Sequence, residues 1–332
     1  VTHTPYFNLW SMDDVPNRTP TCHWTGKPQV LQGIFQVGRR KYGFLGATDA
    51  LPMQLWQVTV EACSTTYVLE SPEARLTLQF TSPLLLDDLQ LLARPITYIA
   101  ITAQGRHGRP LPPCTVSLVA DETLCLDHAG QYPVEYGEAV GPGFAAGTLA
   151  SGVQEVLNRS GDDVRIDWGK VYLAVETGGR VALKEEGERC AIQADRELQE
   201  GKQVLFALAY DEVDAIQYFG KNLPPYWKKE RQTIPGLREL AFAQYPSIAQ
   251  RCQAFSQDLQ ARAQAVGGDA YAELLLLAWR QVVAAHTLCE DEAGELLFIS
   301  KECFSNGCAA TVDITYPCLL YTSPSPRDPK TS

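Results

Sequence analysis

The chain has 332 residues, of which 45% are hydrophobic and 20% are charged, and these are ordinary values for a folded globular protein with room for two domains. The formal net charge of -11 gives the protein a field that repels phosphate backbones, so nucleic-acid binding is disfavoured. No apolar run approaches the roughly 20 residues that a membrane-spanning helix needs, so we expect no membrane span.

Short apolar segments, punctuated by Gly, Pro, Asn and Asp, occupy the first part of the chain to about Tyr226. Strands at this spacing, with no helical pattern between them, predict a β-sandwich or a barrel rather than βαβ units. The Gly-rich stretch 137–147 lacks the spacing of a phosphate-binding loop, and we interpret it as a connector. Examples of the predicted strands are 31–37, 55–60, 76–80, 96–101, 115–119, 164–168, 171–175 and 204–210.

A proline-stiffened, charged junction follows, and we expect a linker over residues 227–246. Apolar residues then recur at helical spacing from Pro246 to Val266, and Gly267-Gly268 would end this helix. A second helix is predicted over 269–288. Two helices joined by a short Gly turn predict an antiparallel hairpin. The apolar face expected on the second helix is Tyr271, Leu274, Leu275, Ala278, Trp279, Val282 and Ala285.

His286, near the end of that helix, is one candidate ligand or base, but a core or helix-terminal histidine is the better interpretation. The densest group of reactive side chains lies in residues 297–317, where an apolar run, a Gly turn and an extended segment follow one another. No metal-ligand, nucleophile-elbow or phosphate-loop pattern is present, so no metal or cofactor is predicted, and from spacing alone a solvated surface loop is favoured. The candidate site residues are Lys301, Glu302, Ser305, Asn306, Asp313 and Tyr316.

The ten cysteines are scattered without CxxC pairs, which argues against zinc and thioredoxin-type sites. We expect most of them to be buried as small hydrophobic residues. Residues 318–328 resemble a translated sequencing adapter, so 318–332 is interpreted as an artefactual tail that packs against nothing, with the natural chain continuing past Pro317. The start at Val1 indicates either a removed leader or a start within the gene.

Short strings spread from the first residues to Pro317 resemble the secreted microbial glutaminase A family. They are TPYFNLWS (4–11), CHWTG (22–26), TSPLLLDDL (81–89), RPITYI (94–99), AYD (209–211), IQYFG (216–220), YAEL (271–274), RQVVAAH (280–286) and SKECFSNG (300–307). In that family a β-rich N-terminal region precedes a helical toroid of six hairpins, and the activity is hydrolysis of glutamine to glutamate and ammonia.

The resemblance implies that residues 1–226 form a β-rich, β-sandwich-like N-terminal domain and that 247–317 begin a truncated (α/α)6 six-hairpin toroid with its first α-hairpin. It also implies a full-length glutaminase, glutamine as the small-molecule substrate, and a secreted or periplasmic location, while the oligomeric state stays open. The sequence departs from the family pattern at Cys22, where the family usually has Arg, and at Cys303 and Cys308.

Amide hydrolysis needs an activated water or nucleophile, donors to the oxyanion and a proton for ammonia. Glu302 or Asp313 is the candidate base or ammonium partner, Lys301 the carboxylate partner or proton donor, and Asn306 the oxyanion donor, with Ser305 and Tyr316 as further substrate contacts. Because a toroidal site is lined by several hairpins, we expect this chain alone to be inactive.

Two alternatives remain open. A β-sandwich ahead of a six-hairpin toroid is also a glycoside hydrolase layout, in which Glu302 and Asp313 would be the carboxylate pair, about 6.5 to 9.5 Å apart for inversion. The other alternative is a non-catalytic β-domain followed by one helical hairpin.

Overall fold

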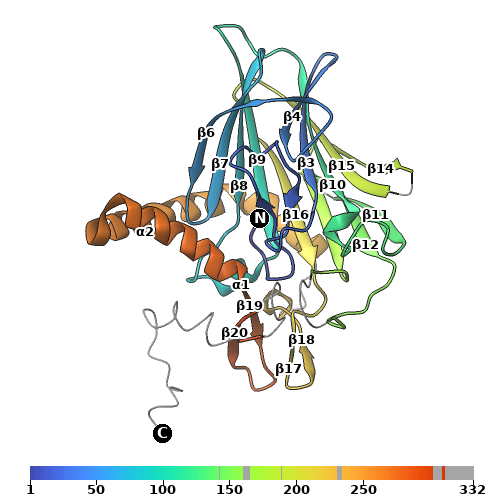
Figure 1. The fold of residues 1–332 in the computed structure, drawn as a ribbon, viewed down its shortest axis with the longest axis vertical. Helices are drawn as coiled ribbons and strands as arrows, with labels where there is room; N and C mark the ends of the chain where they lie inside the picture. Colours follow the sequence, from blue (N-terminus) through green and yellow to red (C-terminus); the bar gives the residue numbers. More distant parts are fainter. Residues whose placement is uncertain (142, 160–164, 188, 230–233, 302–308, 311–332) are drawn as a thin grey trace.

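The structure is a computed structural model that describes residues 1–141, 143–159, 165–187, 189–229, 234–301 and 309–310, with only the backbone at 186 and over 234–241. Within these residues, two large sheets stack as a sandwich and one long helix packs against an outer face (Figure 1). The predicted β-sandwich-like N-terminal region is therefore confirmed, whereas a six-hairpin toroid is not present in the described part of the chain.

The smaller sheet is antiparallel except for the parallel pair β4 and β5. Its strands, in spatial order, are β14 (Arg180–Glu186), β15 (Arg189–Leu198), β10 (Cys114–Asp121), β3 (Leu31–Val37), β4 (Arg40–Leu45) and β5 (Leu51–Pro52).

The larger sheet is antiparallel throughout the described residues. Its strands, in spatial order, are β11 (Val134–Gly141), β12 (Phe144–Ser151), β13 (Lys170–Glu176), β16 (Val204–Asp211), β9 (Ile96–Gly105), β8 (Ala74–Thr81), β7 (Ser64–Glu70) and β6 (Gln54–Val60). Smaller elements are β1 (Trp10–Ser11), β2 (Thr21–Cys22), α1 (Leu89–Ala93), η1 (Glu122–Leu124), β17 (Ile216–Tyr218), β18 (Lys221–Leu223) and η2 (Tyr226–Lys228).

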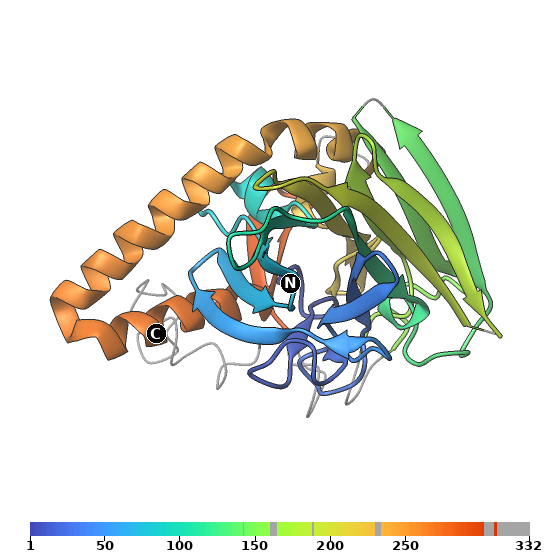
Figure 2. The same cartoon turned by 90° about the horizontal axis from the view of Figure 1, so that it is seen from above.

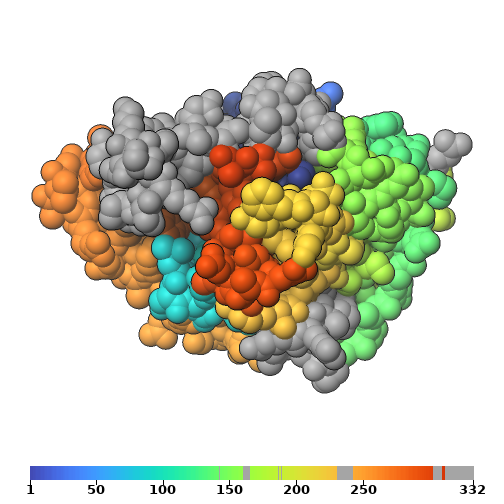
Figure 3. All heavy atoms as spheres, turned by 90° about the horizontal axis from the view of Figure 1, so that it is seen from below, coloured from blue at the N-terminus to red at the C-terminus, as the bar shows by residue number. Residues whose placement is uncertain are grey.

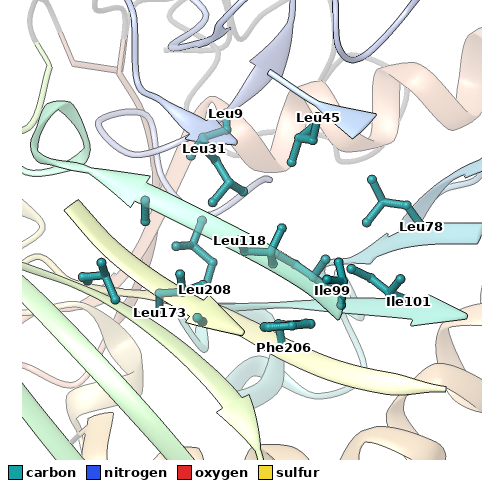
Figure 4. Packing of buried hydrophobic residues seen from close by; sticks show 14 of the residues in the cluster. Leu9, Leu31, Leu45, Leu78, Ile99, Ile101, Leu118, Leu173, Phe206 and Leu208 are labelled. Atoms are coloured by element: carbon teal, nitrogen blue, oxygen red, sulfur yellow. The ribbon is translucent and has the colours of Figure 1, made fainter. Parts of the chain in front are cut away.

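The main core fills the space between the two sheets (Figure 4). Ile99 and Ile101 of β9 and Phe206 and Leu208 of β16 point into it and are fully buried. Leu118 of β10 meets them from the opposite sheet. Burying each such side chain contributes about 1.5–3 kcal/mol, so this layer dominates the stability of the β-domain.

The central strands of the larger sheet are buried on both faces. The residues that alternate with the inward-facing ones, such as Tyr98 and Ala100 of β9 and Ala207 of β16, belong to a second apolar cluster under helix α2 (Ile234–Ala284). Strands buried on two sides read as continuous apolar runs. The cover provided by α2 is the physical reason why residues 96–101 and 204–210 carry so few polar side chains.

Helix α2 bends sharply at Gly268, whose φ of 76° and ψ of -172° are not helical (Figure 2). The bend divides α2 into a first arm before Gly268 and a second arm after it, so the predicted break at Gly267-Gly268 is confirmed. The predicted helix start at Pro246 is wrong, because α2 begins at Ile234 and carries Pro246 inside it. The predicted end at Leu288 is also wrong, since β19 (His286–Glu290) follows immediately.

The face of the second arm that is buried differs from the apolar face predicted from the sequence. Leu276 and Val283 are buried and Trp279 packs inward against the second cluster, whereas Tyr271 and Leu274 are exposed. The broad apolar face predicted from the sequence therefore includes residues on both sides of the arm.

Two strand-level interpretations are corrected by the structure. The stretch 137–147 is no connector, because it supplies most of the hairpin β11–β12. Its small residues allow close packing on the opposite sheet: a Cβ at Gly147 would lie 2.5 Å from Cγ2 of Ile192. In the predicted strand 164–168, the described residues 165–168 form no ladder. That segment is held by side chains instead, with the Trp168 indole donating to the carbonyl of Glu212 at 2.7 Å.

The end of the described chain packs beneath the sandwich. Strands β19 and β20 (Leu296–Ser300) form a hairpin that lies beside β17 and β18 on the lower face (Figure 3). Cys289 and Ile299 share a small apolar cluster with Ile216 and Leu223. The hairpin therefore brings the start of the predicted reactive stretch to the base of the β-domain.

Candidate functional site

Lys301 is the one predicted site residue that the structure describes. Its backbone N–H donates to the carbonyl of Ala285 at 2.9 Å, and its ammonium lies 5.9 Å from the centre of the Tyr6 ring, in cation–π range. Glu302, Ser305, Asn306, Asp313 and Tyr316 lie outside the described residues, so their convergence stays a prediction. The contact with Tyr6 places Lys301 against the N-terminal segment.

That segment folds as a tight turn around Asn8, which is fully buried. The Asn8 amide donates to the carbonyls of Thr4 at 3.1 Å and Pro5 at 3.2 Å. Its carbonyl oxygen accepts from the Trp10 indole at 2.8 Å and from the backbone N–H of Trp24 at 3.2 Å. One side chain therefore fixes the turn, and we call Thr4–Asn8 the N-terminal turn.

His23 supports the same turn from the string CHWTG. It is fully buried, and its Nε2 lies 2.9 Å from the carbonyl of Pro5. A carbonyl only accepts, so Nε2 carries the proton and Nδ1 accepts from the hydroxyl of Thr25 at 3.0 Å. His23 is therefore occupied in holding the turn.

The other side of the turn is held by the larger sheet and by segments next to its strands. The Tyr6 ring packs edge-on against Trp168, with centroids 5.2 Å apart, and Phe7 lies 4.4 Å from Tyr210 of β16. His3 contacts the hydroxyl of Thr97 at 2.8 Å, and Thr97 contacts Ser82 at the same distance. Strings from five distant parts of the sequence, beginning at residues 4, 22, 81, 94 and 209, thus meet around one turn.

Glu212 is a buried acid at this place that the sequence analysis missed. The residue is 3% exposed, and its Oε2 has no hydrogen-bond partner among the residues that the structure describes. Burial raises the pKa of Glu212 to about 8, Lys228 opposes the shift and Asp211 adds to it, while the hydroxyl of Thr4 donates to the carboxyl group. Glu212 therefore retains its proton near neutral pH and sits beside the N-terminal turn, as Lys301 does. The feature of the sequence that could have pointed to Glu212 is its position directly after the string AYD.

Lys228 balances the charge of the neighbouring acids. Its ammonium lies 2.5 Å from Oδ1 of Asp211 and donates to the carbonyl of Val213 at 2.9 Å. Both partners flank Glu212. The lysine neutralises the surface side of this acidic segment and favours the charged form of Glu212, but burial outweighs it and leaves the carboxyl group uncharged. A protonated carboxyl group with a pKa near neutrality is chemically able to give or take a proton.

His286 is a core residue, as predicted. It is 7% exposed, its Nδ1–H donates to the carbonyl of Val282 at 2.6 Å, and its ring stacks on Phe298 with centroids 4.5 Å apart. Burial lowers the pKa of His286, so the ring stays neutral. Among the described residues, no group of three or more His, Cys, Asp or Glu side chains is arranged to hold a metal ion, and none of the helices described is long and apolar enough to cross a membrane.

Comparisons with known proteins match both parts of the chain. Residues 268–326 match the family model described as the glutaminase A six helical-hairpin domain. A search of curated proteins finds no match.

Solved structures that resemble the chain include a putative kojibiose phosphorylase from the human microbiome, with 9% identity, a TM-score of 0.42, and coverage of 86% of this chain and 36% of that chain. They also include the family GH92 inverting mannosidase from Bacteroides thetaiotaomicron, with 10% identity, a TM-score of 0.46, and coverage of 93% and 34%. The chain thus spans about a third of the length of these proteins.

A second family model, described as a domain of unknown function, DUF5127, matches residues 63–200 and 182–262, which together are more than half of the chain. The protein therefore belongs to the DUF5127 family.

Proposed function

We propose that this protein is a six-hairpin hydrolase in which residues 1–226 form a β-rich domain that supports the helical domain. The observation that carries the proposal is the match of residues 268–326 to a six helical-hairpin model. The match begins at Gly268, the bend from which the second arm of α2 starts. The match thus begins with the second arm, whereas α2 itself begins at Ile234.

Contacts between α2 and the β-domain support this division of roles. In the first arm, Arg251 pairs with Asp88 at 3.0 Å, and in the second arm Arg280 donates to the hydroxyl of Thr65 at 2.6 Å. The Trp279 indole donates to the carbonyl of Leu84 at 3.2 Å. A helical domain that begins on α2 thus has a fixed orientation relative to the sandwich.

The outer side of the second arm supports the proposal in a different way. Leu274 is 63% exposed and Leu277 44% exposed, although their neighbours Leu276 and Val283 are buried. Adjacent exposed leucines on one helix are typical of a surface that packs against another helix. We expect a further helix of the six-hairpin domain to cover them.

A glycosidic bond is the first candidate for the bond that the enzyme hydrolyses. The described residues form a two-sheet β-domain packed on a helical arm, and such a domain ahead of a six-hairpin toroid is a glycoside hydrolase layout. Glu302 and Asp313 would be the acid and base, since this chemistry needs two carboxyl groups on opposite sides of the bond. Lys301, held over Tyr6, would contact the substrate from the base of the β-domain.

Glutamine is the second candidate, because the family model that matches residues 268–326 is described by the name of a glutaminase. In that case Glu302 or Asp313 would act as the base, Lys301 would bind the α-carboxylate, and Asn306 would donate to the oxyanion. Ser305 and Tyr316 remain candidate substrate contacts in both cases. We place the enzyme outside the cytoplasm, secreted or periplasmic.

The two candidates are separated by one pair of assays on the same purified protein. Sugar release from aryl glycosides without ammonia from glutamine supports the glycoside hydrolase, and ammonia without sugar supports the glutaminase. If a longer product of the same gene, shown to be folded, releases neither, the proposal of a six-hairpin hydrolase acting on these substrates is wrong.

A further inference from the structure

Two cysteines meet where the first arm of α2 packs on the β-domain. Cys63 precedes β7 and is 2% exposed, and Cys252 lies in α2 and is 3% exposed. Both belong to the apolar cluster between the larger sheet and α2, and their thiols are hydrogen-bonded to each other. Both are reduced in this structure. Residues that are distant in the sequence thus bring two thiols within hydrogen-bonding reach of each other.

The surroundings of this pair are fixed by both arms of α2. The Cys63 thiol also lies 4.0 Å from the carbonyl of Leu84, which accepts the indole N–H of Trp279. The Arg280 guanidinium, bound to Thr65 close by, acts on the same thiol through its positive charge. The sulfur pair therefore sits in a packed site whose walls come from the sheet, the first arm and the second arm.

The two thiols differ in acidity. The hydrogen bond from Cys252 is the main influence that lowers the pKa of Cys63, and the positive charge of Arg280 lowers it further, while burial opposes both. The same hydrogen bond, together with burial, raises the pKa of Cys252. Because the thiolate is the reactive form in thiol–disulfide exchange, Cys63 is the thiol that reacts first.

We propose that Cys63 and Cys252 form a disulfide that fastens the first arm of α2 to the β-sandwich when the protein meets a disulfide oxidant. With oxidised glutathione, the thiolate of Cys63 attacks one sulfur, and glutathione leaves as a thiolate. Cys252 then loses its proton and attacks the sulfur of Cys63, which releases the second glutathione. Two protein thiols are oxidised, one glutathione disulfide is reduced, and the two protons end on the two glutathione thiols.

Such a bond closes a loop of more than half of the chain. A cross-link that closes a long loop restricts the unfolded chain more strongly than a cross-link that closes a short loop. Because both sulfur atoms are buried, the exchange takes place while α2 is opening or before it has packed. The oxidised protein should therefore hold its helical arm on the sheet under conditions that release the arm from the reduced protein.

Cys125 and Cys190 form a matched control pair. Both are held by Glu122: the Cys125 thiol donates to its carbonyl at 3.5 Å and the Cys190 thiol to its carboxyl group at 3.5 Å. Burial is the main cause that raises the pKa of Cys190 to about 12, and it raises that of Cys125 as well. With their thiols engaged by Glu122 and their thiolates disfavoured, these two should stay reduced.

The test is peptide mapping of the full chain after refolding in a glutathione redox buffer, with free thiols blocked by N-ethylmaleimide before digestion. We expect a peptide pair that joins Cys63 to Cys252 and disappears with dithiothreitol, while Cys125 and Cys190 are recovered blocked. In the Cys63→Ser chain, Cys252 should be recovered blocked. The oxidised wild-type chain should also melt several degrees above the reduced one, a difference that Cys63→Ser abolishes.

Three results would overturn the proposal. The first is recovery of both Cys63 and Cys252 as blocked thiols after refolding with oxidised glutathione. The second is a disulfide from either cysteine to a different partner in the folded monomer. The third is an equal melting temperature for the oxidised and reduced wild-type chains even though the linked peptide is present, because a bond that fastens the arm must stabilise it.

Discussion

The rings of Phe255 and Trp279 lie 5.2 Å apart although they belong to opposite arms of α2. The Trp279 indole also donates to the carbonyl of Leu84, so the same side chain ties the second arm to the segment before α1. An aromatic contact across the bend, backed by a hydrogen bond to the β-domain, explains why the two arms keep a fixed relation on either side of Gly268.

Trp279→Ala should lower the free energy of unfolding by about 3 kcal/mol, since it removes a large packed ring and its hydrogen bond together. Trp279→Phe keeps the ring contact with Phe255 and loses the bond to Leu84, so its cost should be about 1 kcal/mol. Urea denaturation of the three proteins measures both differences.

Leu274→Ala is the matched control for these variants. Leu274 lies in the same arm but is 63% exposed, and its truncation should change stability by no more than about 0.5 kcal/mol. If Leu274→Ala lowers the free energy of unfolding as much as Trp279→Ala does, the face of the second arm that packs on the β-domain is not the one that carries Trp279.

Gly268→Ala should destabilise the protein by about 1–3 kcal/mol. Only glycine adopts the combination of φ 76° and ψ -172° without strain, so a Cβ would force the bend to change. Ala261→Gly, at an exposed position within the first arm, should cost about 1 kcal/mol through helix propensity alone. Thermal melts compare the two, and a neutral Gly268→Ala would mean that the arms do not bend at this residue.

Glu212→Gln should remove a pH dependence of stability. The folded pKa of Glu212, about 8, lies above its ordinary value of 4.5, so the folded protein binds this proton more tightly than the unfolded chain does. The stabilisation is fully present below pH 4.5 and is lost as the pH rises toward 8, at about 1.4 kcal/mol per pKa unit as an upper limit.

The measurement is the difference in unfolding free energy between the wild type and Glu212→Gln at pH 5 and at pH 8. The wild type should lose stability relative to the variant between these values. Glu135→Gln, at an exposed site in β11, should follow the wild type at both. A constant difference between the wild type and Glu212→Gln would contradict the burial of an uncharged acid at this position.

The exposed leucines of the second arm should make this chain self-associate. Leu274→Glu combined with Leu277→Glu should lower the sedimenting mass toward that of the monomer, because the charges oppose burial of this surface. Leu86→Glu, at an exposed leucine of the β-domain (55% exposed), should leave association unchanged. A wild-type chain that stays monomeric over a wide concentration range would count against a packing surface on this arm.

The strand pattern was largely readable from the sequence, because β-branched and apolar residues alternate with turn residues. The strand 31–37 was predicted with its observed bounds. The hairpin β11–β12 was missed because its Gly and Ala residues have low β propensity. Close packing against Ile192 on the other sheet requires small residues there. Whether such residues form a strand depends on tertiary packing, which a local sequence pattern does not show.

The site was less predictable than the fold. The sequence placed the reactive residues at 297–317, and of these the structure describes Lys301 against Tyr6. The sequence did not predict that the N-terminal turn and Glu212 lie close together, because their proximity depends on β16 ending beside the first residues of the chain. The unusual pKa of Glu212 arises from burial, which no local sequence pattern reports.

The most direct test of the proposed function is hydrolysis by this chain and by any longer product of the same gene, assayed for sugar release from aryl glycosides beside ammonia release from glutamine. We expect the longer product to hydrolyse a glycoside, with Glu302→Gln and Asp313→Asn each lowering turnover by more than about tenfold, and Glu295→Gln, at an exposed glutamate just before β20, leaving it unchanged. Release of ammonia without sugar would instead support glutamine as the substrate. A folded longer product that releases neither sugar nor ammonia would contradict the account.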